Sequence, residues 1–463
     1  MRISVVIPTF NHRELVRKSL AYVAAQCLSG RVTVEVIVVD DGSNDGTDTM
    51  IQDVRLKCPH DLNYVFRPRD AQSCRGRARN LGIAAAEGDY VLFMDSGVVI
   101  PPNFIAQLGR VLTTETLRPV LLHRVVGLDV DAADFDVALL DGLTPESLQE
   151  RIDALVATEG WADRREGLFW SVGNRLAELP APWALAWSCL MTVPKDLVDA
   201  VGAFDETFME WGAEDIDLAY RLYLAGATFL APSPLCGLHI PHAVSADAEA
   251  KFVSNQRNEQ RMHAKHYHLA TEVYVTYAGL YFNQILGRFH RLVLSDILPF
   301  YPYAFADWMS ERYLASSSRA LLIGDDHLAR LSHWNVTHHF LVNPQLQAII
   351  AMRFKPRRVE LQLGTHTSYG DHWFETAVVT DAIRLFGEEF VTAQMQELLR
   401  IAKQCVIVYT ENSQSPAKRR DGAGQWWSRN ELEQFAASVD AEITEDASWG
   451  RHHVLRLQRK DSR

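Results

Sequence analysis

Two adjacent carboxylates near the N-terminus directly follow an apolar run. Asp40 and Asp41 come after residues 34–39 and lead into Gly42 and Ser43. Carboxylate oxygens accept hydrogen bonds from the N–H edge of a base or from ribose hydroxyls, and they repel phosphate. The same four residues also form a good turn and helix cap. By itself, therefore, the motif leaves a nucleoside contact and a plain turn both open.

Arginines farther along the chain supply the opposite charge. Arg75, Arg77 and Arg79 alternate with small residues ahead of a predicted helix. Their planar guanidinium groups suit a pyrophosphate or a carboxylate, although a solvated basic helix start would carry the same residues. Asp95 follows the apolar run 90–94. A carboxylate in that position can hold a divalent cation, which neutralises a diphosphate leaving group.

A second acidic pair and two histidines follow later. Glu214 and Asp215 come after Gly212, which permits a tight turn, and they begin a predicted helix. Acids in a first helical turn are also favoured by the helix dipole, so capping alone is a sufficient alternative. His239 and His242 lie on an extended segment and are candidate metal ligands. Isolated histidine pairs are, however, more often surface residues.

The elements that position these residues alternate between strand and helix. We predict strands at 3–7, 34–39, 62–66 and 90–94, and helices at 13–26, 77–86 and 214–225. Such alternation predicts an α/β fold in which βαβ units form a parallel sheet covered by helices on both faces. Ligands of such sheets bind in the loops at the carboxyl ends of the strands. The polar residues described above are expected at that edge.

Two segments interrupt or end this pattern. Residues 113–180 show no strand pattern and predict a polar, helical insertion, either a solvated surface excursion or a lid on the acceptor side. It contains four aspartates, namely Asp129, Asp131, Asp134 and Asp136. A long helical stretch, 247–290, predicts the exit from a first domain that covers residues 1–275.

The last third of the chain predicts a second α/β domain at 316–463, after a helical and aromatic linker at 276–315. Its expected strands are 320–323, 338–342, 359–363, 406–409 and 453–457. The strand pattern looks like that of a methyltransferase, but Gly324 stands alone where a cofactor-binding turn is rich in glycine. We expect a degenerate, non-catalytic Rossmann-like module for partner binding or homo-oligomer formation. A working methyltransferase is the alternative.

The amino-acid composition limits the classes of function that this chain can have. The chain has 463 residues, 48% of them hydrophobic and 22% charged, which is typical of a globular protein with two or three domains. Its net charge of -12 argues against sequence-independent binding to nucleic acid, which needs a basic surface. Six scattered cysteines without a Cys-x-x-Cys pair indicate reduced thiols. Neither a signal peptide nor a long uncharged apolar run is found, so we expect no integral membrane segment and a cytoplasmic location.

Taken in order, these motifs resemble the inverting glycosyltransferases of family 2, which have the GT-A fold. The matching pieces are residues 5–11, 38–47, 78–82 and 88–95. Residues 201–206 and 211–215 resemble the branch that contains chondroitin polymerases and β-1,4-galactosyltransferases. The resemblance covers about residues 1 to 270 of the 463. It implies transfer of a hexosyl or N-acetylhexosaminyl group from a nucleotide-sugar donor, expected to be a UDP-sugar, to an unidentified acceptor.

The resemblance also implies roles for individual residues. Asp215 would be the catalytic base and Glu214 an acceptor contact. Thr9 and Asp41 would contact the uracil. The remaining implied donor contacts are Arg79 and Asn80, which would face the nucleotide, and Asp95, which would approach the ribose or the metal.

One departure from the family affects the metal. The family's Asp-x-Asp motif is Asp95-Ser96-Gly97 in this chain, so the second carboxylate is missing. A Mn²⁺ or Mg²⁺ ion would then depend on Asp95 together with His239 and His242. The competing hypothesis is a non-catalytic nucleotide-sugar-binding or scaffold protein that has lost its chemistry. The retained Trp-Gly-Ala-Glu-Asp segment favours the enzyme.

Overall fold

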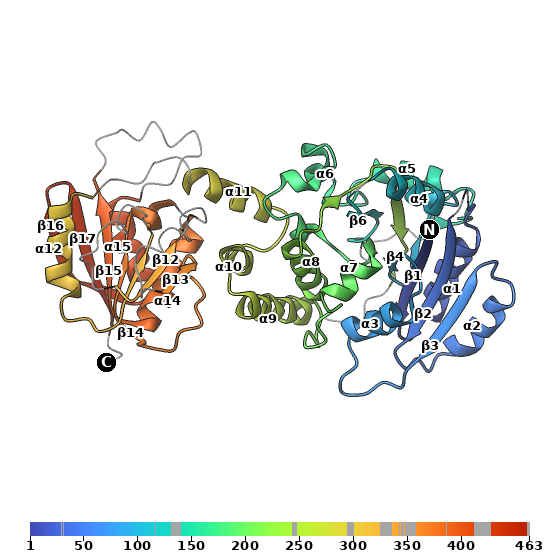
Figure 1. Ribbon diagram of the computed structural model, residues 1–463, viewed down its shortest axis with the longest axis horizontal. Coiled ribbons are helices and arrows are strands. Elements are labelled where there is room, and N and C mark those ends of the chain that lie inside the picture. Colours follow the sequence, from blue (N-terminus) through green and yellow to red (C-terminus); the bar gives the residue numbers. More distant parts are fainter. Residues whose placement is uncertain are drawn as a thin grey trace. The chain divides into compact units, whose positions relative to one another are not determined.

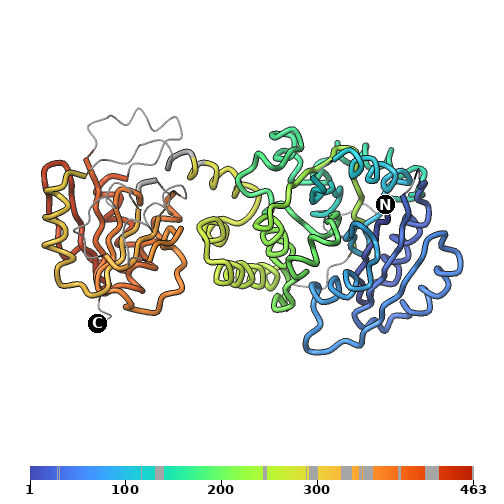
Figure 2. Tube along the Cα trace, in the orientation of Figure 1, coloured from blue at the N-terminus to red at the C-terminus, as the bar shows by residue number. Residues whose placement is uncertain are grey.

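The chain folds into two compact units, which divide between Met262 and His263. Figure 1 labels their elements and Figure 2 follows the chain from one unit into the other. The computed structural model describes residues 1–28, 30, 32–115, 117–130, 140–242, 248–293, 301–324, 336–341, 343, 347, 358–385, 387–411 and 427–460. The division between the two units lies before residue 275, where the sequence predicts the end of the first domain.

A seven-stranded sheet forms the centre of the first unit. Its order is β3-β2-β1-β4-β8-β6-β9, with β1 to β4 parallel and β8 antiparallel to β4. The strands are β1 (Arg2–Thr9), β2 (Thr33–Asp40), β3 (Asp61–Phe66), β4 (Tyr90–Met94), β6 (Val120–Leu122), β8 (Leu190–Pro194) and β9 (Phe229–Leu230). The four parallel strands confirm the predicted α/β sheet. Their carboxyl ends meet at one edge, as the sequence analysis expects.

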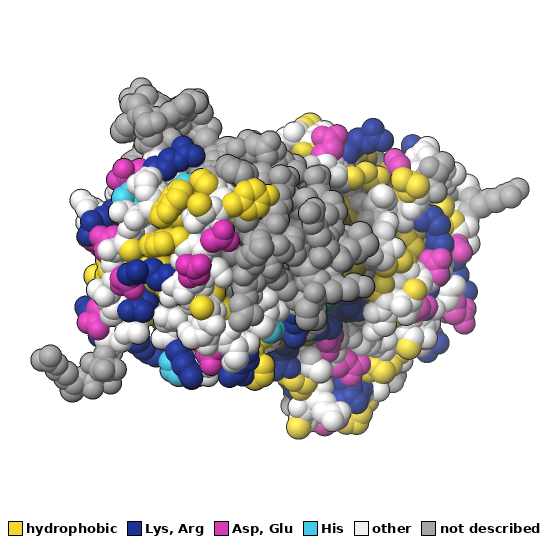
Figure 3. All heavy atoms as spheres, turned by 60° about the vertical axis from the view of Figure 1, so that its left-hand side comes forward, with side chains coloured by type: hydrophobic (Ala, Val, Ile, Leu, Met, Phe, Trp, Pro, Cys, Tyr) yellow, Lys and Arg dark blue, Asp and Glu magenta, His cyan; other side chains and the backbone are white. Residues whose placement is uncertain are grey.

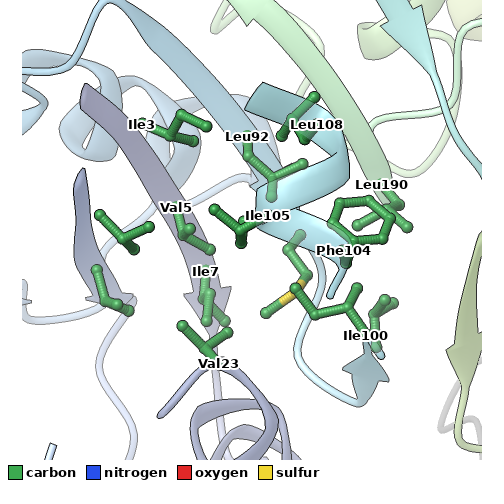
Figure 4. Packing of buried hydrophobic residues seen from close by; sticks show 14 of the residues in the cluster. Ile3, Val5, Ile7, Val23, Leu92, Ile100, Phe104, Ile105, Leu108 and Leu190 are labelled. Atoms are coloured by element: carbon green, nitrogen blue, oxygen red, sulfur yellow. The ribbon is translucent and has the colours of Figure 1, made fainter. Parts of the chain in front are cut away.

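Helices cover both faces of this sheet. Ile3, Val5 and Ile7 of β1 pack into one apolar cluster with residues of α1 (Arg13–Ala24) and α4 (Phe104–Thr114), as Figure 4 shows. Helix α3 (Arg75–Ala85) lies against Val6, which points to the opposite face because side chains alternate along a strand. The unit also contains α2 (Thr47–Arg55), α5 (Leu148–Val156), α6 (Glu166–Ser171), α7 (Lys195–Ala200), α8 (Glu214–Leu224) and most of α9 (Ala248–His266).

The interpretation of residues 113–180 as a strandless, solvated insertion is wrong for the described part of that segment. It contributes β6 to the main sheet and β7 (Arg124–Val126) to a small sheet of order β5-β10-β7. The other two strands of that small sheet are β5 (Val98–Val99) and β10 (Cys236–His239). Asp163 and Arg165 are fully buried, because each neutralises the other inside the unit. Of the four aspartates, Asp129 is paired with Arg164, and the others lie outside the described residues.

The predicted helical stretch, 247–290, is divided into three helices over its described residues. Between α9 and α10 (Leu269–Thr276), Tyr267 takes the left-handed conformation at φ +44° and His268 caps the new helix. Helix α11 (Phe282–Val293) follows. A hydrophobic period survives such a break, and for this reason the sequence pattern did not reveal it.

The second unit contains another seven-stranded sheet, of order β13-β12-β11-β14-β15-β17-β16. Its strands are β11 (Ala320–Ile323), β12 (His338–Leu341), β13 (Arg358–Leu361), β14 (Phe374–Val379), β15 (Ala402–Thr410), β16 (Ala441–Trp449) and β17 (His452–Arg459), and its further helices are α12 (Tyr303–Met309), α14 (Glu388–Ile401) and α15 (Arg429–Ser438). The first five strands are parallel in a Rossmann-like order. The prediction of a second α/β domain is confirmed, although it omitted β14 and β16.

Two further features concern the surface and the helices of the described residues. Lys and Arg side chains are interspersed with Asp and Glu over the described part of the face that Figure 3 shows, without a continuous basic stripe there. Among the described helices, none combines the length and apolar character that a membrane crossing needs.

Candidate active site

Asp41 lies at the carboxyl end of β2 in a ring of polar partners. Its Oδ2 accepts a hydrogen bond from Arg69 Nη1 at 2.8 Å, and its Oδ1 accepts one from Ser73 Oγ at 3.0 Å. Arg67 Nη1 is 3.4 Å from Oδ1. The carboxylate is thus buried but fully paired, and a base N–H would join or displace these partners.

Thr9, at the end of neighbouring β1, has an unused hydroxyl. The residue is buried, and within the described part of the chain its Oγ1 has no hydrogen-bond partner. Buried hydroxyls are normally paired, so such an atom is a candidate ligand contact. Beside it, the guanidinium of Arg69 lies 4.0 Å above the centre of the half-exposed Phe10 ring.

Arg79 connects two acids that are far apart in the sequence. From α3, its Nη2 donates to Asp95 Oδ1 at 2.9 Å, and its Nη1 lies 3.5 Å from Glu214 Oε1. The guanidinium is almost completely buried, whereas Asp95 is partly exposed at the end of β4. Burying these carboxylates requires a counter-charge, which Arg79 provides. The resemblance implies that Arg79 faces a nucleotide, but here its hydrogen bonds go to the chain's own acids.

Asn80 contacts the chain itself rather than open space. Its Nδ2 donates to the carbonyl of Phe204 at 2.9 Å and to Glu206 Oε1 at 3.0 Å, and its Oδ1 accepts from the Phe204 N–H at 2.9 Å. This amide therefore fastens the 204–206 loop to α3. The expected nucleotide contact is not among its bonds.

Gly97 stands where the family's metal motif has its second carboxylate, and its backbone conformation disfavours a side chain. It has φ +94° and its amide donates to Ser19 Oγ at 2.9 Å. An aspartate would be strained in this left-handed conformation, because its Cβ meets the backbone there. In this backbone conformation, the turn after Asp95 could carry a second carboxylate only with strain.

Asp215 lies partly buried in the first turn of α8. Its Oδ2 accepts a hydrogen bond from the Ser188 N–H at 3.2 Å. Burial, followed by the negative charge of Glu214, raises the pKa of Asp215 to about 7. A carboxyl group with such a pKa exchanges a proton near neutral pH, as a general base must.

A strained turn places this acidic pair. Gly212 has φ +104° and Ala213, which precedes α8, has φ +60°. A left-handed conformation costs about 1–2 kcal/mol for a residue with a side chain, so the surroundings must hold Ala213 in place. A Cβ on Gly212 would lie 2.2 Å from Asn255 Oδ1 of α9, which leaves room for glycine only.

Arg165 contacts the segment that precedes Ser188, whose amide binds Asp215. No sequence motif pointed to this arginine. It forms an ion pair with Asp163 at 2.7 Å and donates to the carbonyl oxygens of Leu185 and His123, each at 2.8 Å. Its guanidinium also lies 4.2 Å from the centre of the Trp187 ring. These contacts fix the segment that presents the Ser188 amide.

The two predicted histidine ligands lie together. The ring centres of His239 and His242 are 5.2 Å apart, and the ring centre of His12 is also 5.2 Å from that of His242. His239 Nδ1 is buried and has no hydrogen-bond partner among the residues described. Burial, and then His242, lower the pKa of His239 to about 4, so its imidazole is neutral at pH 7.

Each of these groups could supply one ligand to a cation, but together they do not form a complete coordination site. Asp95 is partly exposed but paired with Arg79, and His239 has an unpaired nitrogen. In the part of the chain that is described, no three His, Cys, Asp or Glu residues are grouped to hold a metal ion. The residues fit an ion that brings further oxygen ligands with it, such as those of a diphosphate.

The structure thus links Asp95, Arg79 and Glu214 directly and places Thr9 and Asp41 at the same sheet edge. Arg67 and Arg69 belong to no motif singled out from the sequence, although they follow β3 and therefore lie at a carboxyl strand end, where ligands bind. Arg165 and the residues of α9 carry no local sequence signal.

Comparison with known families agrees with this architecture. Residues 4–133 match Glycosyl transferase family 2, and residues 171–243 match the N-terminal domain of galactosyltransferase. Within the first unit, residues 4–133 therefore match a family 2 glycosyltransferase domain, and residues 171–243 match a galactosyltransferase segment. The predicted family and branch are confirmed.

Curated relatives share the first part of the chain. Validoxylamine A glucosyltransferase of Streptomyces hygroscopicus subsp. jinggangensis is 30% identical over 285 residues, which are 60% of this chain and 65% of that protein. Chondroitin synthase of Escherichia coli is 26% identical over 238 residues, which are 49% of this chain and 33% of that protein. The chain therefore spans less than two thirds of the length of these relatives.

Solved structures show a more distant likeness. TarS 1-349 of S. aureus in complex with UDP-GlcNAc is 20% identical, with a TM-score of 0.39, over 59% of this chain and 67% of that one. A mannosyltransferase of Pyrobaculum calidifontis in complex with GDP-Man and Mn²⁺ is 17% identical, with a TM-score of 0.38, over 57% of this chain and 64% of that one.

Proposed function

We propose that the first unit is an inverting glycosyltransferase that moves a sugar from a UDP-sugar to an acceptor, with Asp215 as the general base. The observation that carries this proposal is the raised pKa of Asp215, a desolvated carboxyl group at the start of α8. The buried Arg79 bridge to Asp95 supports it, because the bridge joins the neighbouring Glu214 to the end of β4.

The chemistry follows from these groups. Asp215 takes the proton from an acceptor hydroxyl, or from another nucleophile, as the acceptor atom forms a bond to the anomeric carbon. The bond from that carbon to the diphosphate breaks on the opposite face, and the nucleoside diphosphate leaves with the electron pair. The anomeric configuration is therefore inverted. General-base help of this kind contributes ~10²–10⁴-fold.

The donor nucleotide is assigned to the ends of β1 and β2. The unpaired hydroxyl of Thr9 and the carboxylate of Asp41 suit a uracil edge, which offers both an N–H donor and carbonyl acceptors. Phe10 and Arg69 form a flat neighbouring surface on which a base could stack.

Asp95, His239 and the donor diphosphate would together hold Mn²⁺ or Mg²⁺, with His242 beside them. When bound, the cation neutralises the charge of the departing diphosphate. Because the chain supplies few ligands, affinity for the cation without donor is expected to be low. His239 is suited to this role because its neutral ring keeps a lone pair available.

The relatives support sugar transfer but leave the acceptor open. One is named a glucosyltransferase, another a chondroitin synthase and a third a hyaluronan synthase. The competing function is a nucleotide-sugar-binding protein without turnover. A partly buried carboxyl group with a raised pKa favours the enzyme, since binding alone does not require a base.

Asp215→Asn tests the proposal, because it removes the base with almost no change in volume. We expect kcat to fall by ~10²-fold or more, with UDP-sugar affinity nearly unchanged by calorimetry. Retention of more than about a tenth of the wild-type kcat would refute Asp215 as the base, since a general base contributes more than that. Donor binding by a wild type that shows no turnover, even with Mn²⁺, would establish the competing function.

A further inference from the structure

Helix α9 lies beyond the residues that match either family, 4–133 and 171–243. Three of its side chains nevertheless donate hydrogen bonds to one irregular segment, residues 207–212. Ser254 Oγ donates to the carbonyl of Trp211 at 2.7 Å, and Asn258 Nδ2 donates to that of Gly212 at 2.8 Å. Arg261 Nη1 donates to the carbonyl of Thr207 at 2.7 Å.

The spacing of these residues is that of a single helix face. Positions i, i+4 and i+7 of a helix lie one above another, so Ser254, Asn258 and Arg261 form a row. Ser254, Asn258 and the accepting residue Gly212 are buried, and a buried carbonyl group such as that of Gly212 needs a partner. Because residues 207–212 belong to no helix or strand, the row supplies the hydrogen bonds that secondary structure would otherwise provide.

The row ends at the strained turn that begins α8. Asn258 holds the carbonyl of Gly212, directly before Ala213, the left-handed residue that precedes Glu214 and Asp215. Asn255 packs against Gly212, and its Nδ2 donates to Glu259 Oε1 at 2.7 Å. A turn in this conformation persists only where its surroundings hold it.

We infer that α9 sets the position of the catalytic base, with Asn258 as the main positioning residue and Ser254 as a second. Asn258 touches neither the donor nor the acceptor in this assignment; it acts through Gly212 and Ala213 on Asp215. The inference rests on the proposed function for its catalytic meaning, but the support of the turn is a property of the fold. Misplacing a catalytic group by about 1 Å can cost ~10²-fold in rate.

The test compares Asn258→Asp with Gln256→Glu in the full chain. The first variant keeps the side-chain shape, removes the donor and places an oxygen against the Gly212 carbonyl. The second makes the same chemical change at an exposed position of α9. We expect Asn258→Asp to lower kcat about tenfold or more while the donor KM stays within about twofold, and Gln256→Glu to match wild type.

Two substitutions of Ser254 test whether a hydroxyl group at this position restores activity. Ser254→Ala loses the bond to Trp211 and should lower kcat, whereas Ser254→Thr keeps a hydroxyl and should restore most of the loss. If Ser254 contributed only to overall stability, its substitutions would lower the melting temperature and kcat together. The hydroxyl of Ser254→Thr would then not restore kcat separately. An unchanged kcat in both Asn258→Asp and Ser254→Ala would overturn the inference.

Hydrogen exchange separates this inference from the proposed function. In Asn258→Asp, amides of residues 207–213 should exchange faster while the rest of the first unit is unchanged. This readout stands even if Asp215→Asn keeps activity, in which case only the assignment of the base fails. Uniformly faster exchange throughout the unit, or no change at 207–213, would refute the role of α9.

Discussion

Arg79 shows how one buried residue sets the charges around it. Its guanidinium is almost completely buried and pairs with Asp95 and Glu214, and Asp215 lies close enough to interact with it electrostatically. Three acids could not share this space without a cation, since like charges raise the cost of burial. Asp215 receives only part of this compensation, and its pKa therefore stays raised.

The raised pKa predicts a pH dependence of the reaction. A general base works only when deprotonated, and burial makes Asp215 hold its proton to higher pH than an exposed aspartate. The kcat/KM for transfer should therefore rise with pH through a midpoint at about 7 and level off above it. Rates measured at constant ionic strength between acid and mildly alkaline pH would check this.

Glu214→Gln provides the control for the cause of this shift. Removing the neighbouring negative charge should move the midpoint to lower pH, because that charge is one of the groups that raise the pKa of Asp215. A midpoint that stays in place, or activity that falls as the pH rises toward 7, would contradict the assignment.

At the scale of elements, the candidate site lies in turns next to strands and helices. The backbone conformation of each turn limits which side chains it can place there. The turn after β4 contains Asp95 and Gly97, and the positive φ of Gly97 excludes an unstrained side chain there. The turn before α8 is held by hydrogen bonds from a distant helix. In the proposed mechanism, these two short turns determine how the metal and the base are held.

The turn after β4 predicts an unusual metal dependence. Wild-type turnover should disappear in EDTA and return with Mn²⁺ or Mg²⁺, whose binding should saturate only when donor is present. His239→Ala should raise the Mn²⁺ concentration needed for half-maximal rate. Full activity in EDTA would show that arginine side chains replace the cation.

Gly97→Asp is the informative variant of the same turn. Although it restores the family's sequence motif, it should not tighten metal binding, because a side chain at this φ strains the backbone. We expect a loss of about 1–2 kcal/mol in stability, measured by denaturant unfolding. Tighter Mn²⁺ binding at unchanged stability would contradict this reading of the turn.

At the scale of the whole molecule, the second unit has a Rossmann-like sheet, and its own side chains fill the described part of the carboxyl edge near β11 and β14. At the end of β14, Asp381 accepts a hydrogen bond from Tyr301 and one from the Thr410 hydroxyl at 2.7 Å. A Cβ on Gly324, just after β11, would lie 2.4 Å from Thr380 Oγ1. Side chains of the second unit itself thus occupy this part of the sheet edge, where folds of this kind bind a ligand.

This packing predicts that the chain does not bind S-adenosylmethionine. Calorimetric titration of the full chain should give no heat of binding at micromolar concentration, with a UDP-sugar titration as the positive control. Micromolar affinity for S-adenosylmethionine would show that the second unit is a working cofactor domain.

The sequence by itself determined the α/β class, most strands of both units and the position of the acidic motifs at strand and helix ends. These features follow from local periodicity and from residues adjacent in the chain, such as Asp40 with Asp41 or Glu214 with Asp215. The short strands β6 and β7 escaped prediction because their apolar runs are too brief to show a period.

Only the tertiary structure decided which partners these residues have. Arg79 and Glu214 are 135 positions apart, and Asn258 and Gly212 are 46 apart, so no local pattern could pair them. Arg165 belongs to a segment that looks solvated, yet it is buried because Asp163 and backbone carbonyls satisfy its charge. Packing brings such groups together from distant parts of the chain, and their burial then sets the pKa of the base and the shape of the turns around it.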